Sequence, residues 1–263
     1  METATFWDCI WETWAETWKS VSRRPSAVVI ALAVLLVANF ALVALDHMHG
    51  PIPLTSASRL LRSVLGLAKS AVTLALPVQV IQQIMLGEHK FRVGSVFGRE
   101  FWRYLLLGTI IGLAFCAVAF VFIGGSFLVL HASGFGHGGT RLPLVLLSLV
   151  VFCLMMFVAT RLSLLFCHVA LGGTMRWRAS WMDTRGYFWR IVISHFLTAL
   201  PIQICAGCLL FLGGTASRAM GMEVQSYLFA IAYSLYVAVG MTVSAACSCW
   251  LYRRFAKTLL NRS

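Results

Sequence analysis

Long runs of residues without a charge alternate with short polar segments along the whole chain. No Asp, Glu, Lys or Arg occurs in residues 25–45, 70–87, 104–140, 142–160, 191–217 or 224–252. A helix needs about twenty apolar residues to cross the roughly 30 Å hydrocarbon layer of a membrane. Because no water is present there to bond an open backbone, runs of this length must be helical. We therefore expect an all-α polytopic bundle of six transmembrane helices near residues 26–45, 64–86, 104–130, 143–166, 190–213 and 226–251.

The composition supports the same class of protein. Hydrophobic residues make up 60% of the chain and charged residues only 11%. In soluble domains about a quarter of the residues are charged. We therefore treat residues 1–263 as a single integral membrane domain.

The basic residues lie mainly on one side of the expected spans. Fifteen of the 21 Lys and Arg residues precede the first, third and fifth spans or follow the last, and four lie in the other connections. Lys and Arg collect in cytoplasmic loops, so this bias predicts a bacterial inner-membrane protein with both termini in the cytoplasm, including a basic tail over 252–263. The net charge of +12 then indicates anionic phospholipid as a partner and needs no nucleic acid.

The first 22 residues form a pattern of their own, with tryptophans at 4-3-4 spacing. These residues are Trp7, Trp11, Trp14 and Trp18. This spacing draws one stripe along a helix and predicts an amphipathic helix over residues 1–22 in the cytoplasmic interface. Glu12 and Glu16 flank the stripe, and anionic headgroups would repel them. One hypothesis is that this helix docks against the arginine-rich loops at 90–103 or 176–190; the alternative is a plain interfacial anchor.

Two cytoplasmic segments resemble each other closely. "FRVGSVFGREFWRY" (91–104) and "WRASWMDTRGYFWRI" (177–191) both end in Phe-Trp-Arg before an apolar run, and "ETWKSVSRRPSAVVI" (16–30) is a looser copy. One interpretation is three parallel repeats, each an amphipathic helix followed by a two-span hairpin. The alternative is that each inner loop carries Trp and Arg because both favour the interface. Either way we expect Trp102, Arg103, Trp189 and Arg190 to contact lipid headgroups.

The segment "RLSLLFCHVALGG" (161–173) followed by "RASWMDTRGYFWRI" (178–191) resembles a known family. It is similar to the bacterial membrane domain attached to glycerophosphodiester phosphodiesterases and to the stand-alone relatives of that domain. The matching positions are Arg161, Leu162, Ser163, Ser180, Trp181, Thr184 and Gly186. The family usually has a proline shortly after the arginine, where this chain has Cys167 and His168. The resemblance implies a multi-span inner-membrane protein and transfers no activity, because no metal-binding carboxylate cluster is present.

Three basic residues fall inside the expected spans, away from the span ends: Lys69, Arg161 and His195. Such groups are costly in a membrane and are often functional. A polar seam along the bundle interior would suit a carrier or flippase for an anionic amphiphile. It would run through Lys69, Thr73, Gln83, Arg161, His168, His195 and Thr198. The alternative is that both cations snorkel to the interfaces or pair with structural partners.

The sequence shows no constellation typical of an enzyme or a cofactor site. No paired carboxylates or nucleophile and base stand together. Four histidines in the outer connections, His47, His49, His131 and His137, are ligand types for zinc or copper, but none stands at fixed helical spacing, and we expect no metal. We therefore expect a non-enzymatic protein, without cofactor, that organises lipid or a membrane-protein partner at the cytoplasmic interface. The alternative function is the carrier.

Overall fold

The computed structural model describes residues 6–23, 25–49, 56–87, 98–125, 141–220 and 222–260. Throughout these residues the regular structure is helical, with no strand. The elements are α1 (Phe6–Arg23), α2 (Pro25–His49), α3 (Ser56–Leu86), α4 (Arg99–Ala119), η3 (Phe120–Gly124), α6 (Arg141–Ala170), α7 (Trp177–Asp183), α8 (Phe188–Met220), α9 (Met222–Phe255) and α10 (Lys257–Leu260). The expected all-α class is therefore confirmed.

Within the described residues, six helices are long and apolar enough to cross a membrane. They cover Pro25–Met48, Ser56–Leu86, Arg99–Phe122, Val145–Ala170, Phe188–Leu212 and Val224–Phe255. Each overlaps one span expected from the charge-free runs. The second starts earlier than residue 64, because Arg59 and Arg62 extend α3 beyond its apolar part, where Arg62 pairs with Asp46 at 3.3 Å. The prediction of six spans is confirmed.

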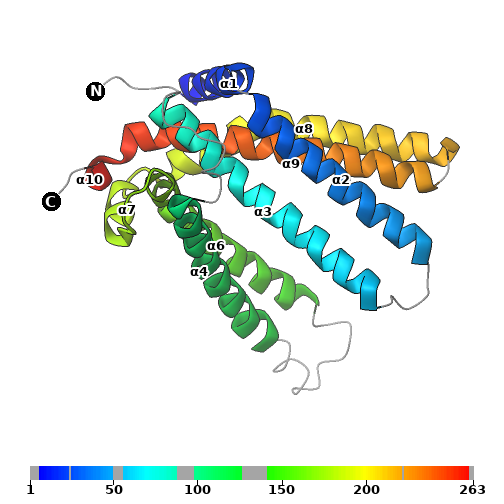
Figure 1. Ribbon diagram of the computed structural model, residues 1–263. Coiled ribbons are helices and arrows are strands. Elements are labelled where there is room, and N and C mark those ends of the chain that lie inside the picture. The colour runs from blue at the N-terminus through cyan, green and yellow to red at the C-terminus, as the bar shows by residue number, and fades with distance from the viewer. Residues whose placement is uncertain are drawn as a thin grey trace.

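The three hairpins α2–α3, α4–α6 and α8–α9 diverge from one end of the bundle (Figure 1). The short helices α7 and α10 and the surface helix α1 lie at this end (Figure 1). We call it the basic end, because its described residues include Lys19, Arg23, Arg103, Arg190, Arg253, Arg254 and Lys257. Helix α9 packs against α1, α2, α3 and α8 and is the central element of the fold.

The buried core is concentrated near the basic end. Fully buried side chains there come from α6, α8, α9 and α10 and include Leu165, Val169, Ile191, Leu251 and Leu259. The far part of α4, η3 and the far part of α6 instead expose large apolar side chains such as Leu113, Phe120 and Phe152. Because lipid tails are as apolar as these side chains, exposure there costs little, and tight packing is needed only where the hairpins converge.

Two glycines end α6 at this convergence. Gly172 has a positive φ of 87°, which glycine adopts without strain. A Cβ atom on Gly173 would lie 2.3 Å from His168 Nε2, so no larger residue fits without displacing the imidazole. The chain therefore leaves α6 in a tight turn, and Gln82 of α3 donates a hydrogen bond to the Ala170 carbonyl at 3.0 Å. The helix continues unbroken past Cys167 and His168 to Ala170.

The described part of the predicted basic tail, up to Leu260, is largely helical. Helix α9 continues to Phe255, and α10 packs on α7. Asp183, at the end of α7, accepts hydrogen bonds from the backbone N–H groups of Thr258 at 2.8 Å and Leu259 at 2.9 Å. These contacts satisfy the first free N–H groups of α10, as an N-cap would.

Candidate functional site at the basic end

Helix α1 presents its tryptophans away from the bundle. Trp7, Trp11 and Trp18 are 70%, 73% and 75% exposed. Trp14, the fourth member of the predicted stripe, is partly buried beside an apolar groove of α8 and α9. The opposite face buries small side chains: Cys9, Thr13, Thr17 and Ser20. The amphipathic helix is confirmed, and its exposed face has the composition of a membrane-interface anchor.

Two acidic side chains of α1, Glu12 and Glu16, contact residues of α9 that the sequence did not indicate as partners. Glu12 accepts a hydrogen bond from Trp250 Nε1, and Glu16 forms an ion pair with Arg253. Both partners lie near the end of α9. The hypothesis placed this helix on the arginine-rich loops at 90–103 or 176–190, whereas the described contacts of Glu12 and Glu16 are with α9. Residues 90–97 of the first loop lie outside the described residues. Helix α9 ends directly beneath α1 and offers the nearer cation.

Arg161 lies in a cluster formed by α6 and α7. Its guanidinium carbon is 5.0 Å from the ring centre of Phe157 and 5.4 Å from that of Trp181. Its Nη1 is 3.5 Å from the Thr184 hydroxyl, and Ser180 Oγ donates to its carbonyl at 2.9 Å. Arg161 thus contacts Ser180, Trp181 and Thr184, and these contacts hold α7 against α6. Cation–π contacts of this kind suit a positive charge without a carboxylate.

Lys69 lies in a second, separate cluster formed by α2, α3 and α9. Its Nζ donates to Asn39 Oδ1 at 3.0 Å and lies 4.3 Å from the ring centre of Tyr233. Asn39 Nδ2 in turn donates to Ser234 Oγ at 2.9 Å. These partners are neutral but polar, and they account for the ammonium inside the apolar layer.

The polar residues expected along one seam contact different neighbours. Gln83 donates to the Ser20 carbonyl of α1 at 3.0 Å, and His168 Nδ1 lies 2.9 Å from Tyr252 Oη. Thr198 bonds the carbonyl of Ser194 in its own helix. His195 lies half-buried near the start of α8. The structure therefore places the two intramembrane cations in separate clusters rather than along one path.

The two Phe-Trp-Arg phrases share one arrangement. In each the ring of Phe packs edge-on against the following Trp, with ring centres 5.7 Å apart for Phe101–Trp102 and 5.2 Å for Phe188–Trp189. Trp102 and Trp189 are exposed, as expected for interface contact. Arg103 differs from Arg190: Arg103 Nη1 donates to the Gly172 carbonyl at 3.3 Å, whereas Arg190 is exposed. When the two segments are aligned on Phe-Trp-Arg, the residues of the 91–104 segment that correspond to α7 fall within 88–97, outside the described residues.

The histidines at the far end do not form a metal site within the part of the chain that the structure describes. There, no three His, Cys, Asp or Glu side chains come together as metal ligands. His47 stacks on Tyr227, with ring centres 6.1 Å apart. His131, His137 and the side chain of His49 lie outside the described residues.

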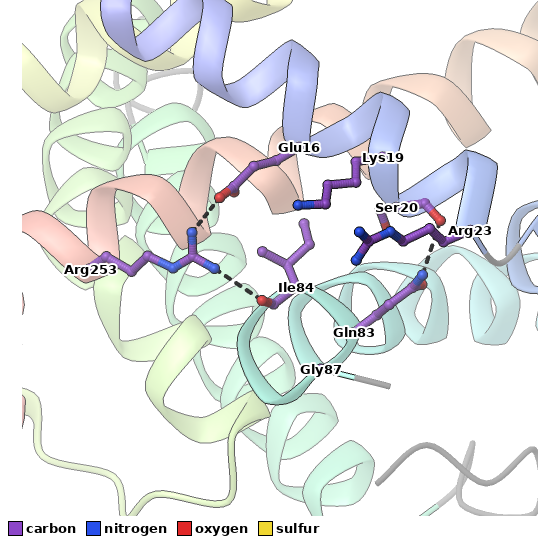
Figure 2. Close-up of a pocket in the computed structure, with 8 residues that line it drawn as sticks. All are labelled: Glu16, Lys19, Ser20, Arg23, Gln83, Ile84, Gly87 and Arg253. Atoms are coloured by element: carbon purple, nitrogen blue, oxygen red, sulfur yellow. Dashed lines mark hydrogen bonds and ion pairs between the residues drawn. The ribbon is translucent and has the colours of Figure 1, made fainter. Parts of the chain in front are cut away.

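A charged cavity of about 210 Å³ opens at the basic end where α1, α3 and α9 end (Figure 2). Its lining residues are Glu16, Lys19, Ser20, Arg23, Gln83, Ile84, Gly87 and Arg253. Sequence reasoning used the three basic residues only as signals of orientation. Their positions near the ends of three helices were the available signal, but the sequence does not show which helix ends meet.

No family model matches this chain, and neither a curated protein nor a solved structure matches it.

Proposed function

We propose that this membrane protein binds anionic phospholipid at its basic end and has no catalytic activity. The observation that carries the proposal is α1, which lies across the bundle with three exposed tryptophans on its outer face. Tryptophan favours the headgroup region, and cations beside it attract anionic lipid. The resemblance to the membrane domain of glycerophosphodiester phosphodiesterases remains a prediction and is compatible with this role.

The proposal places the basic end in the cytoplasm of a bacterial cell. The described part of the far end carries an ion pair between Asp46 and Arg62, whereas the basic end carries an excess of cations. By the positive-inside rule this asymmetry supports that orientation. Reporter fusions at His49, Gly136 and Ala216 should be active outside the cytoplasm, and cytoplasmic activity at these positions would overturn the orientation.

The lipids that co-purify with the full chain test the function. Extraction in mild detergent, followed by mass spectrometry, should show phosphatidylglycerol enriched over phosphatidylethanolamine relative to the source membrane. Replacing Trp7, Trp11 and Trp18 together by Ala should reduce this enrichment. These side chains are exposed, so the fold should remain.

Phe211→Ala is the matched control, because this ring is 72% exposed and lies on α8 away from α1. It should leave the enrichment unchanged. Equal lipid composition in the wild type and the surrounding membrane would refute the proposed function.

A further inference from the structure

The cavity beneath α1 is bordered by three different helices near their C-terminal ends. Lys19 and Arg23 come from α1, Gln83 from α3, and Arg253 from α9 (Figure 2). A volume of about 210 Å³ corresponds to roughly seven water molecules at about 30 Å³ each. The space is therefore large enough for a phosphate group that keeps part of its hydration.

The lining residues that the structure describes carry more positive than negative charge. Lys19, Arg23 and Arg253 are basic and Glu16 is acidic, so the formal net charge of these residues is +2. Arg253 is held in place on both sides, because it pairs with Glu16 and donates through Nη2 to the Ile84 carbonyl at 3.0 Å. A cation fixed in this way is preorganised to contact an anion.

Lys19 is the side chain whose position points to a ligand. Its ammonium extends into the space between Glu16 and Arg23 (Figure 2). It forms no hydrogen bond or ion pair with any residue that the structure describes. Basic residues near helix C-termini can simply offset the partial negative charge of the last carbonyls, as Arg253 does at Ile84. Lys19 contacts no such carbonyl.

From these observations we infer that the cavity binds a phosphate monoester, the group found in lipids of the phosphatidic acid type. A phosphate monoester carries about −1.5 to −2 charge near pH 7 and offers three acceptor oxygens, which matches a net +2 site. A phosphodiester headgroup carries a single negative charge and leaves the site uncompensated. The inference rests on the proposed function, which places the basic end at headgroup depth.

Calorimetric titration of the full chain in detergent tests the inference. The probes are dioctanoyl phosphatidic acid, dioctanoyl phosphatidylglycerol, dioctanoyl phosphatidylcholine and inorganic phosphate. Phosphatidic acid should bind more tightly than either diester. Lys19→Met should weaken that binding about tenfold, the effect of losing one charge-assisted hydrogen bond, and Lys19→Arg should retain it.

Lys257→Met is the matched control, because it removes the same charge from an exposed position on α10 at the basic end. It should change the affinity less than twofold. If Lys19→Met and Lys257→Met behave alike, or if phosphatidylglycerol binds as tightly as phosphatidic acid, the inference is wrong.

The remaining outcomes separate the inference from the proposed function and identify the source of the phosphate. Inorganic phosphate that binds as tightly as phosphatidic acid would assign the cavity to a soluble phosphate, and weaker binding would assign it to the lipid. An equal affinity of the wild type for all three lipids would refute the proposed function as well. Preference for both anionic lipids without an effect of Lys19→Met would refute the inference alone.

Discussion

The contact between α1 and α9 leads to a prediction about Glu16. Its side chain is 26% exposed and that of Arg253 is 44% exposed, so solvent screens much of their attraction. A screened pair of this kind contributes up to about 1 kcal/mol. We therefore expect Glu16→Gln to destabilise the fold by about 0.5–1 kcal/mol. Glu16→Lys also adds repulsion between Lys and Arg253, which costs about 1 kcal/mol for two charges in contact in water. Together with the lost attraction, this substitution should destabilise the fold by about 2 kcal/mol.

The assay is thermal unfolding of the purified chain in detergent, together with limited proteolysis of α1. Glu16→Lys should unfold at a lower temperature than Glu16→Gln, and its α1 should be cut faster. Asp46→Lys is the control, because Asp46 also belongs to an exposed ion pair but lies at the far end with Arg62. It should not change the cleavage of α1. Equal unfolding temperatures for Glu16→Gln and Glu16→Lys would refute the reasoning.

The same substitution has an opposite effect on the cavity. Glu16→Gln raises the net charge of the described lining residues from +2 to +3, by removal of a carboxylate. It should therefore bind phosphatidic acid more tightly while it lowers the unfolding temperature. Loss of binding in this variant would indicate that Glu16 positions Arg253 for the ligand.

Three further substitutions test other contacts. Arg161→Leu removes the contacts with Phe157, Trp181 and Thr184, so it should destabilise the fold by about 1–2 kcal/mol and lower the unfolding temperature. The lipid enrichment should not change. Normal stability together with lost lipid enrichment would instead favour the carrier alternative. Gly173→Ala should destabilise by about 1–3 kcal/mol, because its Cβ would collide with the His168 ring, and an unchanged unfolding temperature would contradict this turn geometry. Asp183→Ala should cost about 1–2 kcal/mol and speed hydrogen exchange at residues 258 and 259, whereas unchanged exchange there would exclude the capping role.

The spans were predictable because a long apolar segment in lipid has few structural solutions. Residues 25–45, for example, contain no charge and can only cross as a helix, and α2 confirms this. The tryptophan stripe of α1 was predictable for the same reason, since helical periodicity is a local property. These features depend on neighbours within a few turns of the same helix.

The docking partner of α1 and the cavity were not predictable in this way. Glu16 and Arg253 are 237 residues apart, and nothing near either residue identifies the other. In the sequence, Asp183 is one acidic residue in a polar segment between two spans. In the structure it accepts a hydrogen bond from the backbone N–H of Thr258, 75 residues later. Such pairs depend on which hairpins converge, and hydropathy does not carry that information.

The distance along the chain between α1 and its partners has a consequence for biosynthesis. At about 5–20 residues per second, a ribosome reaches Arg253 on the order of tens of seconds after Glu16. During that interval the newly made α1 has no Trp250 or Arg253 to receive it, and the bilayer surface is its available resting place. The proposed interfacial role of α1 therefore predicts that its exposed tryptophans hold the helix at the bilayer surface until the last hairpin is made.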